Sequence, residues 1–114
     1  MPRDERVYLR HIADAIARIN DYLGGVSERE FRERQIVQSA VIRELEIIGE
    51  AAKNLSEDFH REHPEVGWPD VIAMRNRLIH AYFDVDLSVV WEVVRDDLPV
   101  LDAFVRRTLA RSRG

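Results

Sequence analysis

The sequence predicts an all-α protein, an up-and-down four-helix bundle with one extra short helix. Apolar residues recur at the spacing of a helix through most of the chain. No segment alternates apolar and polar residues over a useful length, so we expect no strands. The 5 glycines and 4 prolines fall between the helical patterns. Long helices with short connections favour a bundle.

The composition is typical of one globular domain, which we expect to cover residues 1–114. Of the 114 residues, 46% are apolar and 33% charged, which supplies both a core and a polar surface. We expect no membrane span and no signal peptide. The sequence has no cysteine, which excludes disulfides, thiolate metal sites and a cysteine nucleophile. A cytoplasmic location is therefore expected.

The net charge of −4 limits how the chain could meet nucleic acid. Proteins that bind nucleic acid through general electrostatic attraction have a basic surface. RNA binding by this chain therefore requires a local patch or a small, chemically specific cleft.

Three helices are expected in the first half. The first runs from about Asp4 to Leu23, where Gly24-Gly25 ends it. Ser27 and Glu30 have the spacing of a capping box and begin a short helix. That helix runs into, or bends before, a long helix expected to end near His63-Pro64.

Two further helices are expected in the second half. Pro69 suits the first turn of a helix that we expect over residues 69–82, since its missing N–H costs nothing there. Asp84 or Asp86 then caps the last helix. The apolar stripe of that helix keeps its phase through a proline, so we expect a kink near Asp96 and no full stop.

Two charged residues fall on apolar faces of these helices. Glu44 lies near the middle of the long helix's apolar stripe, and Arg75 lies among apolar residues of the fourth helix. A lone buried charge is costly, so each needs a partner or water. They could pair with each other, or their stems could reach outward to solvent.

Asn76 and His80 lie one helical turn apart and point away from that apolar side. On an ideal helix Arg75 and His80 are about 140° apart, so one helix cannot easily aim both at one phosphate. The arginine could curl, the helix could loosen before Phe83, or a second copy of the chain could complete the site.

A metal site is not favoured. Glu57 and His60 have the spacing of half a di-iron bundle site, but the sequence has no second Glu-x-x-His. We expect no metal and no cofactor.

The segment from Arg75 to Tyr82 resembles the signature of the HEPN superfamily of helical ribonucleases, an arginine and a polar residue followed by a histidine. The tyrosine two residues after His80 resembles the HepT toxins in particular. The likeness extends over nearly the whole chain and includes Leu45-Glu46-Ile47-Ile48-Gly49-Glu50-Ala51, the turn from Pro64 to Trp68, and Asp97-Leu98-Pro99.

This resemblance implies a fold, an activity and partners. HepT-like proteins are the toxin half of type II toxin–antitoxin systems and cut RNA without a metal. They are homodimers whose cleft lies at the subunit interface and joins the motifs of both chains, which would resolve the angle between Arg75 and His80. Their antitoxin, MNT, is a small nucleotidyltransferase-fold protein that silences the toxin by transferring AMP from ATP to the motif tyrosine, here Tyr82.

The chemistry of the residues fits catalytic roles for Arg75, Asn76 and His80. RNA carries its own nucleophile, the 2′-hydroxyl, so the enzyme needs proton transfer and charge stabilisation. His80 exchanges protons near neutral pH. Arg75 offers a planar fork to the phosphate, and Asn76 could orient His80 or contact the phosphate. The expected products carry a 2′,3′-cyclic phosphate and a 5′-hydroxyl.

Supporting roles are open for Glu44, Gly49 and Glu50. Gly49 and Glu50 lie off the main stripe, where a glycine permits close approach of another helix, across a dimer for example; the alternative is an ordinary surface turn. A different class of function also remains: a non-catalytic helical dimer that serves as the binding or regulatory subunit of a nucleotidyltransferase, with Arg75 and Glu44 as a structural pair.

Overall fold

The computed structural model describes residues 3–81 and 84–111, and these form an all-α bundle, as expected. The helices are α1 (Arg3–Leu23), α2 (Glu28–Glu33), α3 (Gln35–Asn54), α4 (Glu57–Glu62), α5 (Trp68–Ile72), α6 (Met74–Leu78), α7 (Leu87–Glu92), the π-helical turn η1 (Val93–Asp97) and α8 (Leu98–Arg111). Two short strands, β1 (Ile79–Ala81) and β2 (Asp84–Val85), lie between α6 and α7. No helix in the described ranges is both long and apolar enough to cross a membrane.

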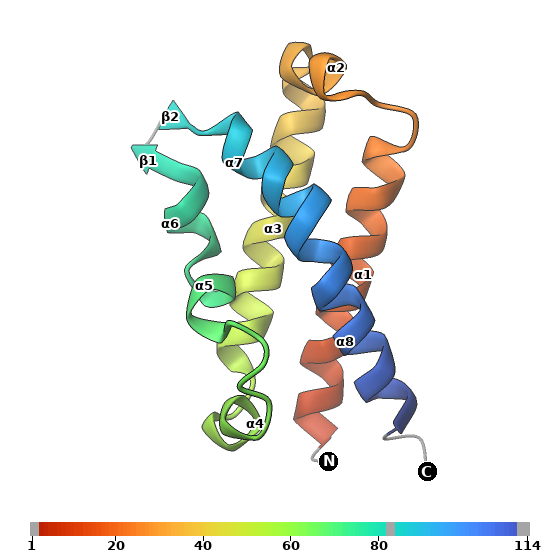
Figure 1. Ribbon diagram of the computed structural model, residues 1–114, viewed down its shortest axis with the longest axis vertical. Helices are drawn as coiled ribbons and strands as arrows, with labels where there is room; N and C mark the ends of the chain where they lie inside the picture. Colours follow the sequence, from red (N-terminus) through yellow and green to blue (C-terminus); the bar gives the residue numbers. More distant parts are fainter. Residues whose placement is uncertain (1–2, 82–83, 112–114) are drawn as a thin grey trace.

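Helices α1 and α3 form the centre of the bundle and run in opposite directions (Figure 1). Helix α8 packs against α1, and the short helices α5 and α6 pack against α3. The segment that begins with Arg75 therefore starts within α6, a helix that packs on α3.

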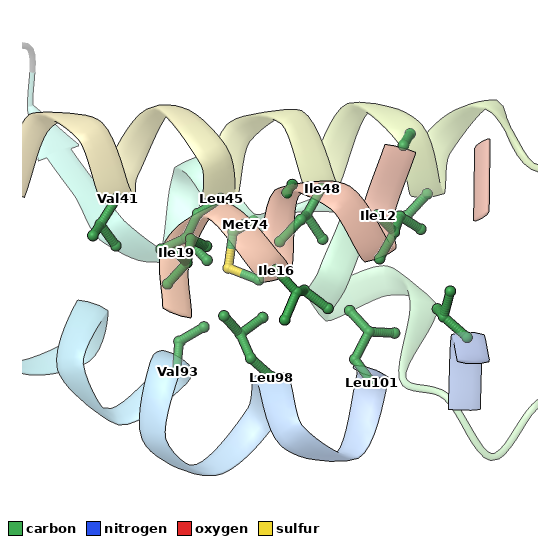
Figure 2. Packing of buried hydrophobic residues seen from close by; sticks show 14 of the residues in the cluster. Ile12, Ile16, Ile19, Val41, Leu45, Ile48, Met74, Val93, Leu98 and Leu101 are labelled. Atoms are coloured by element: carbon green, nitrogen blue, oxygen red, sulfur yellow. The ribbon is translucent and has the colours of Figure 1, made fainter. Parts of the chain in front are cut away.

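The core lies where α1, α3, α6 and the last helices meet (Figure 2). The predicted stripe of α1 is buried, and residues from the facing helices interdigitate with it. Burying each large apolar side chain contributes about 1.5–3 kcal/mol, so this cluster dominates the stability of the bundle. Its labelled members are Ile12, Ile16, Ile19, Val41, Leu45, Ile48, Met74, Val93, Leu98 and Leu101.

The turn between α1 and α2 follows the prediction. Gly25 has a φ of 74°, a left-handed conformation that glycine adopts without strain. The backbone N–H of Glu30 donates to Ser27 Oγ at 3.2 Å, and that of Ser27 donates to Glu30 Oε1 at 3.2 Å. The capping box is therefore confirmed.

The long helix ends earlier than expected, at Asn54 and not near His63. Ser56 caps the separate helix α4, because its Oγ accepts from the backbone N–H of Phe59 at 3.0 Å. The buried carboxylate of Glu5 accepts from the Ser56 backbone N–H and from its hydroxyl, both at 3.0 Å. This contact with α1 fixes the break, because the Ser56 N–H is satisfied outside a helix.

The fourth helix is also shorter than expected. It breaks at Ala73, resumes as α6 and ends at Leu78. The expectation of no strands is wrong here, since β1 and β2 pair antiparallel, with Ile79 opposite Val85. The backbone N–H of Asp86 donates to the carbonyl of Leu78 at 2.8 Å, which holds the returning chain beside the helix end.

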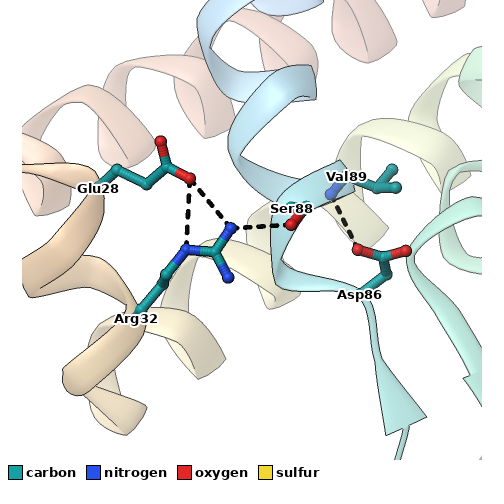
Figure 3. Close-up of polar contacts among 5 residues, drawn as sticks. All are labelled: Glu28, Arg32, Asp86, Ser88 and Val89. Carbon is teal, nitrogen blue, oxygen red and sulfur yellow. Dashed lines mark hydrogen bonds and ion pairs between the residues drawn. The ribbon is translucent and has the colours of Figure 1, made fainter.

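The last helical segment follows the prediction. Asp86 caps α7 by accepting from the backbone N–H of Val89 at 3.2 Å (Figure 3). The irregularity expected near Asp96 is the π-helical turn η1, directly before Leu98 and Pro99. Proline has no N–H to donate, and the wider turn lets the helix continue to Arg111.

Candidate functional site

A cleft of about 400 Å³ lies between α3 and the α5–α6 pair, and we call it the Arg75 cleft. It contains the arginine that begins the motif, together with a second arginine and two carboxylates from α3. The lining residues are Arg43, Glu46, Ile47, Gly49, Glu50, Ile72 and Arg75.

Gly49 sets how closely α5 approaches α3. A Cβ at this position would lie 3.1 Å from the Val71 carbonyl oxygen and 3.3 Å from that of Ile72. Contacts this short with backbone atoms would push the helices apart. Of the two alternatives for Gly49, close approach of another helix is therefore the one observed, and its partner is a helix of the same chain. Glu50, the next residue, is exposed and lines the cleft.

Arg75 does not lie on an apolar face. Its side chain is 61% exposed, and its Nε is 3.3 Å from Glu46 Oε2. A continuous helix over residues 69–82 would place Arg75 on the apolar face, but the break at Ala73 changes the helical phase and turns Arg75 away from that face. Met74 and Leu78 are buried in its place, and the guanidinium points toward solvent and the cleft.

Glu44 does not pair with Arg75, which was one of the two possibilities left open by the sequence. Glu44 is buried, and it accepts from Arg18 Nε at 2.8 Å and from the Tyr22 hydroxyl at 3.2 Å. The hydrogen bond with Glu44 raises the pKa of Arg18. Desolvation and the same carboxylate raise the pKa of Tyr22. Glu44 therefore joins α3 to α1 and does not line the Arg75 cleft.

The motif residues after Arg75 lie partly on α6 and partly beyond its end. Asn76 is exposed on α6, and the backbone of His80 belongs to β1. The helix ends two residues before His80, so the angle of an ideal helix does not apply to this pair. Of the arrangements considered, the helix does loosen before Phe83. Tyr82 lies outside the described residues.

The chain that follows the motif is anchored to α2 (Figure 3). Arg32 donates from Nη2 to Ser88 Oγ at 2.8 Å and to Glu28 Oε2 at 3.0 Å. Ser88 lies in the first turn of α7, directly after the Asp86 cap. These bonds fix where the chain resumes after β2, and so they limit the positions open to the motif's strand.

Two cleft residues, Arg43 and Glu46, were not identified from the sequence. A signal was present, because close approach of another helix was one of the two alternatives for Gly49. Residues three positions apart share a helix face, so Glu46 lies on the Gly49 side of α3. His60, whose spacing from Glu57 was considered and not favoured as part of a metal site, has its Nε2 2.9 Å from the Ala52 carbonyl oxygen.

The structure combines an all-α bundle, an exposed arginine in a cleft and a histidine shortly after the helix end, and the comparisons place such a chain in the class of helical ribonucleases. The family model "Ribonuclease HepT-like" matches residues 12–108, and the chain belongs to this family. Membership confirms the resemblance seen in the segment from Arg75 to Tyr82, and it identifies the chain as an endoribonuclease.

Several curated proteins are similar to the chain. The "Probable ribonuclease HepT" of Thermococcus cleftensis is 46% identical over 101 residues, 89% of this chain and 92% of that protein. A "Putative RNase" of Caldanaerobacter subterraneus subsp. tengcongensis is 35% identical over 108 residues, 95% and 96% of the two chains. No solved structure matches the chain significantly.

Proposed function

We propose that the chain is the toxin of a type II toxin–antitoxin system and cleaves RNA without a metal ion. The observation that carries the proposal is the exposed Arg75 guanidinium in its cleft, beside a helix that ends before His80. A cytoplasmic location, expected from the lack of cysteine, stays a prediction.

The reaction uses the 2′-hydroxyl of RNA as its nucleophile. The 2′-oxygen attacks the adjacent phosphorus and loses its proton, while the bond from phosphorus to the 5′-oxygen breaks and that oxygen gains a proton. His80 serves one of these proton transfers. Arg75 stabilises the negative charge that builds on the phosphate oxygens. Asn76, one residue on, orients His80 or contacts the phosphate.

The charges of the cleft agree with a local mode of RNA binding. Arg43, Arg75, Glu46 and Glu50 all line the cleft, so the lining carries two positive and two negative groups. Such a site does not attract RNA along a broad surface, in line with the net charge of −4. Recognition depends on placing one phosphate against Arg75.

A homodimer with a shared cleft completes the site in this proposal. The motif of each chain would supply one side of the cleft, so that Arg75 of one copy can act with a histidine from the other. Membership of the HepT-like family supports this arrangement.

Regulation follows from Tyr82, two residues after His80. An MNT-type nucleotidyltransferase antitoxin would join AMP to this residue: the tyrosine oxygen attacks the α-phosphate of ATP, and pyrophosphate leaves. The product places bulk and negative charge beside the position of the RNA phosphate, which blocks binding by repulsion.

Expression in cells tests this function. The wild-type chain alone should arrest growth, and the Arg75→Ala and His80→Ala variants should not. Coexpressed antitoxin should restore growth and add the mass of AMP to the intact protein, and Tyr82→Phe should escape that rescue. Growth that is the same with the wild type and both variants would favour the non-catalytic binding subunit.

A further inference from the structure

The ion pair between Glu46 and Arg75 joins α3 to α6 within the Arg75 cleft. Glu46 Oε2 lies 3.3 Å from Arg75 Nε, and the two side chains are 41% and 61% exposed. A pair this exposed contributes little to folding stability, since exposed ion pairs are weak and screened by salt. Its position in the cleft therefore needs another explanation.

The geometry of the pair leaves Arg75 able to bind phosphate. A guanidinium has two edges that can hold an anion, one that includes Nε and one between Nη1 and Nη2. Glu46 contacts Nε. A carboxylate at that edge and a phosphate at the terminal edge can bind the same guanidinium together.

The support beneath Glu46 is rigid. Gly49 follows it by three residues on α3, and the Val71 and Ile72 carbonyls pack at that point. The spacing between α3 and the α5–α6 pair is thereby fixed one turn from Glu46. From this backbone position the Glu46 carboxylate reaches to 3.3 Å from Arg75 Nε.

We propose that Glu46 is a positioning residue of the ribonuclease, whose carboxylate holds Arg75 with its terminal nitrogens toward the scissile phosphate. The inference rests on the proposed function, because it takes Arg75 to contact RNA. Without Glu46, an exposed arginine samples many rotamers and spends less time in the reactive arrangement.

Removal of Glu46 has two kinetic consequences, and the fall in kcat is the one that reports on Arg75. The charge of Glu46 repels RNA, so its removal strengthens binding and lowers KM. The same change releases Arg75 and slows cleavage of bound RNA, so kcat falls as well. A residue that only stabilised the fold would reduce the amount of active enzyme and leave KM unchanged.

The test compares Glu46→Gln with Glu50→Gln on one RNA, with kcat and KM measured separately. Both variants remove one negative charge from the cleft, but only Glu46 contacts Arg75 in the described part of the chain. Glu46→Gln should lower kcat about fivefold, the most that an exposed pair supplies, and lower KM about twofold. Glu50→Gln should also lower KM about twofold. Its loss of kcat should be at least roughly threefold smaller than that of Glu46→Gln.

A double variant tests whether Glu46 acts through Arg75. In the Arg75→Ala background, Glu46→Gln should cause no further loss of kcat. A further fivefold loss there, or a Glu46→Gln enzyme whose kcat stays the same or rises, overturns the positioning role. An inactive wild type overturns the ribonuclease proposal itself, whereas active wild type with equal Glu46→Gln and Glu50→Gln enzymes overturns the positioning role alone.

Discussion

At the scale of single residues, Glu44 is a buried carboxylate with two partners on α1. Arg18 and Tyr22 both donate to it, and each of these donors also reaches solvent. Glu44→Ala should lower the free energy of unfolding by about 1.5–3 kcal/mol, the range for hydrogen bonds to charged groups. Urea denaturation measures the change. Glu33→Ala, which removes an exposed carboxylate of α2, is the control and should have no measurable effect.

Tyr22 gives the same contact a pH dependence. Its pKa is raised above the ordinary 10.0 by desolvation and by its hydrogen bond to Glu44. Because the folded pKa exceeds the unfolded one, the stabilisation is complete below pH 10 and is lost as pH rises through the folded pKa. Wild type should therefore lose its stability advantage over Tyr22→Phe in strongly alkaline solution. Denaturation curves measured below pH 10 and in strongly alkaline solution, with phenolate absorbance to follow ionisation, check this. A stability difference between wild type and Tyr22→Phe that stays the same in both conditions would contradict it.

Some residues could be assigned from the sequence and others could not. The capping box at Ser27 and Glu30 is local, so its spacing was sufficient. The pairing of Glu44 was missed because its partners lie 26 and 22 residues away, and a helical wheel shows only its own helix. The helical periodicity of α3 shows that Glu44 needs a partner, but it cannot show which residue that partner is.

At the scale of elements, the contact of α5 with α3 depends on Gly49. Gly49→Ala would place a methyl group 3.1 Å from the Val71 carbonyl oxygen, so the helices must separate. Overpacking costs about 1–3 kcal/mol, and the better helix propensity of alanine offsets up to about 1 kcal/mol of this. We expect a net loss of stability and slower RNA cleavage.

Gly24→Ala is the matched control for this prediction. A Cβ at Gly24 would lie 3.6 Å from its nearest neighbours, which is ordinary contact. Thermal unfolding and cleavage assays of the two variants should separate them. Equal stability and activity of both variants would contradict the role given to Gly49.

Element boundaries were predicted least well where the fold sets them. The end of α3 depends on Glu5, which lies 51 residues from Ser56 and satisfies its N–H. No glycine or proline marks the break at Ala73 in the sequence. A helix that runs on through residues 69–82 therefore places Arg75 on the wrong face. By contrast, the Asp86 cap and the irregularity before Pro99 have local causes and were predicted.

At the scale of the whole molecule, the proposed homodimer makes a quantitative prediction. The Arg75→Ala protein should keep only a small residual activity, and the His80→Ala protein should be inactive. After subunit exchange, about half of the dimers are mixed, and one of their two sites has both side chains intact if each site draws on both chains. The mixture should therefore regain about a quarter of wild-type activity. Confirmed exchange without recovery would contradict a site that pairs Arg75 of one chain with His80 of the other.

The central claim is that the chain cleaves RNA through Arg75 and His80 without a metal. The most direct measurement is RNA cleavage in excess EDTA by protein whose intact mass shows no AMP, beside His80→Ala, with the product ends identified. We expect cleavage that persists in EDTA, disappears with His80→Ala and leaves 2′,3′-cyclic phosphate and 5′-hydroxyl ends. Cleavage abolished by EDTA, or retained by His80→Ala, would contradict the account.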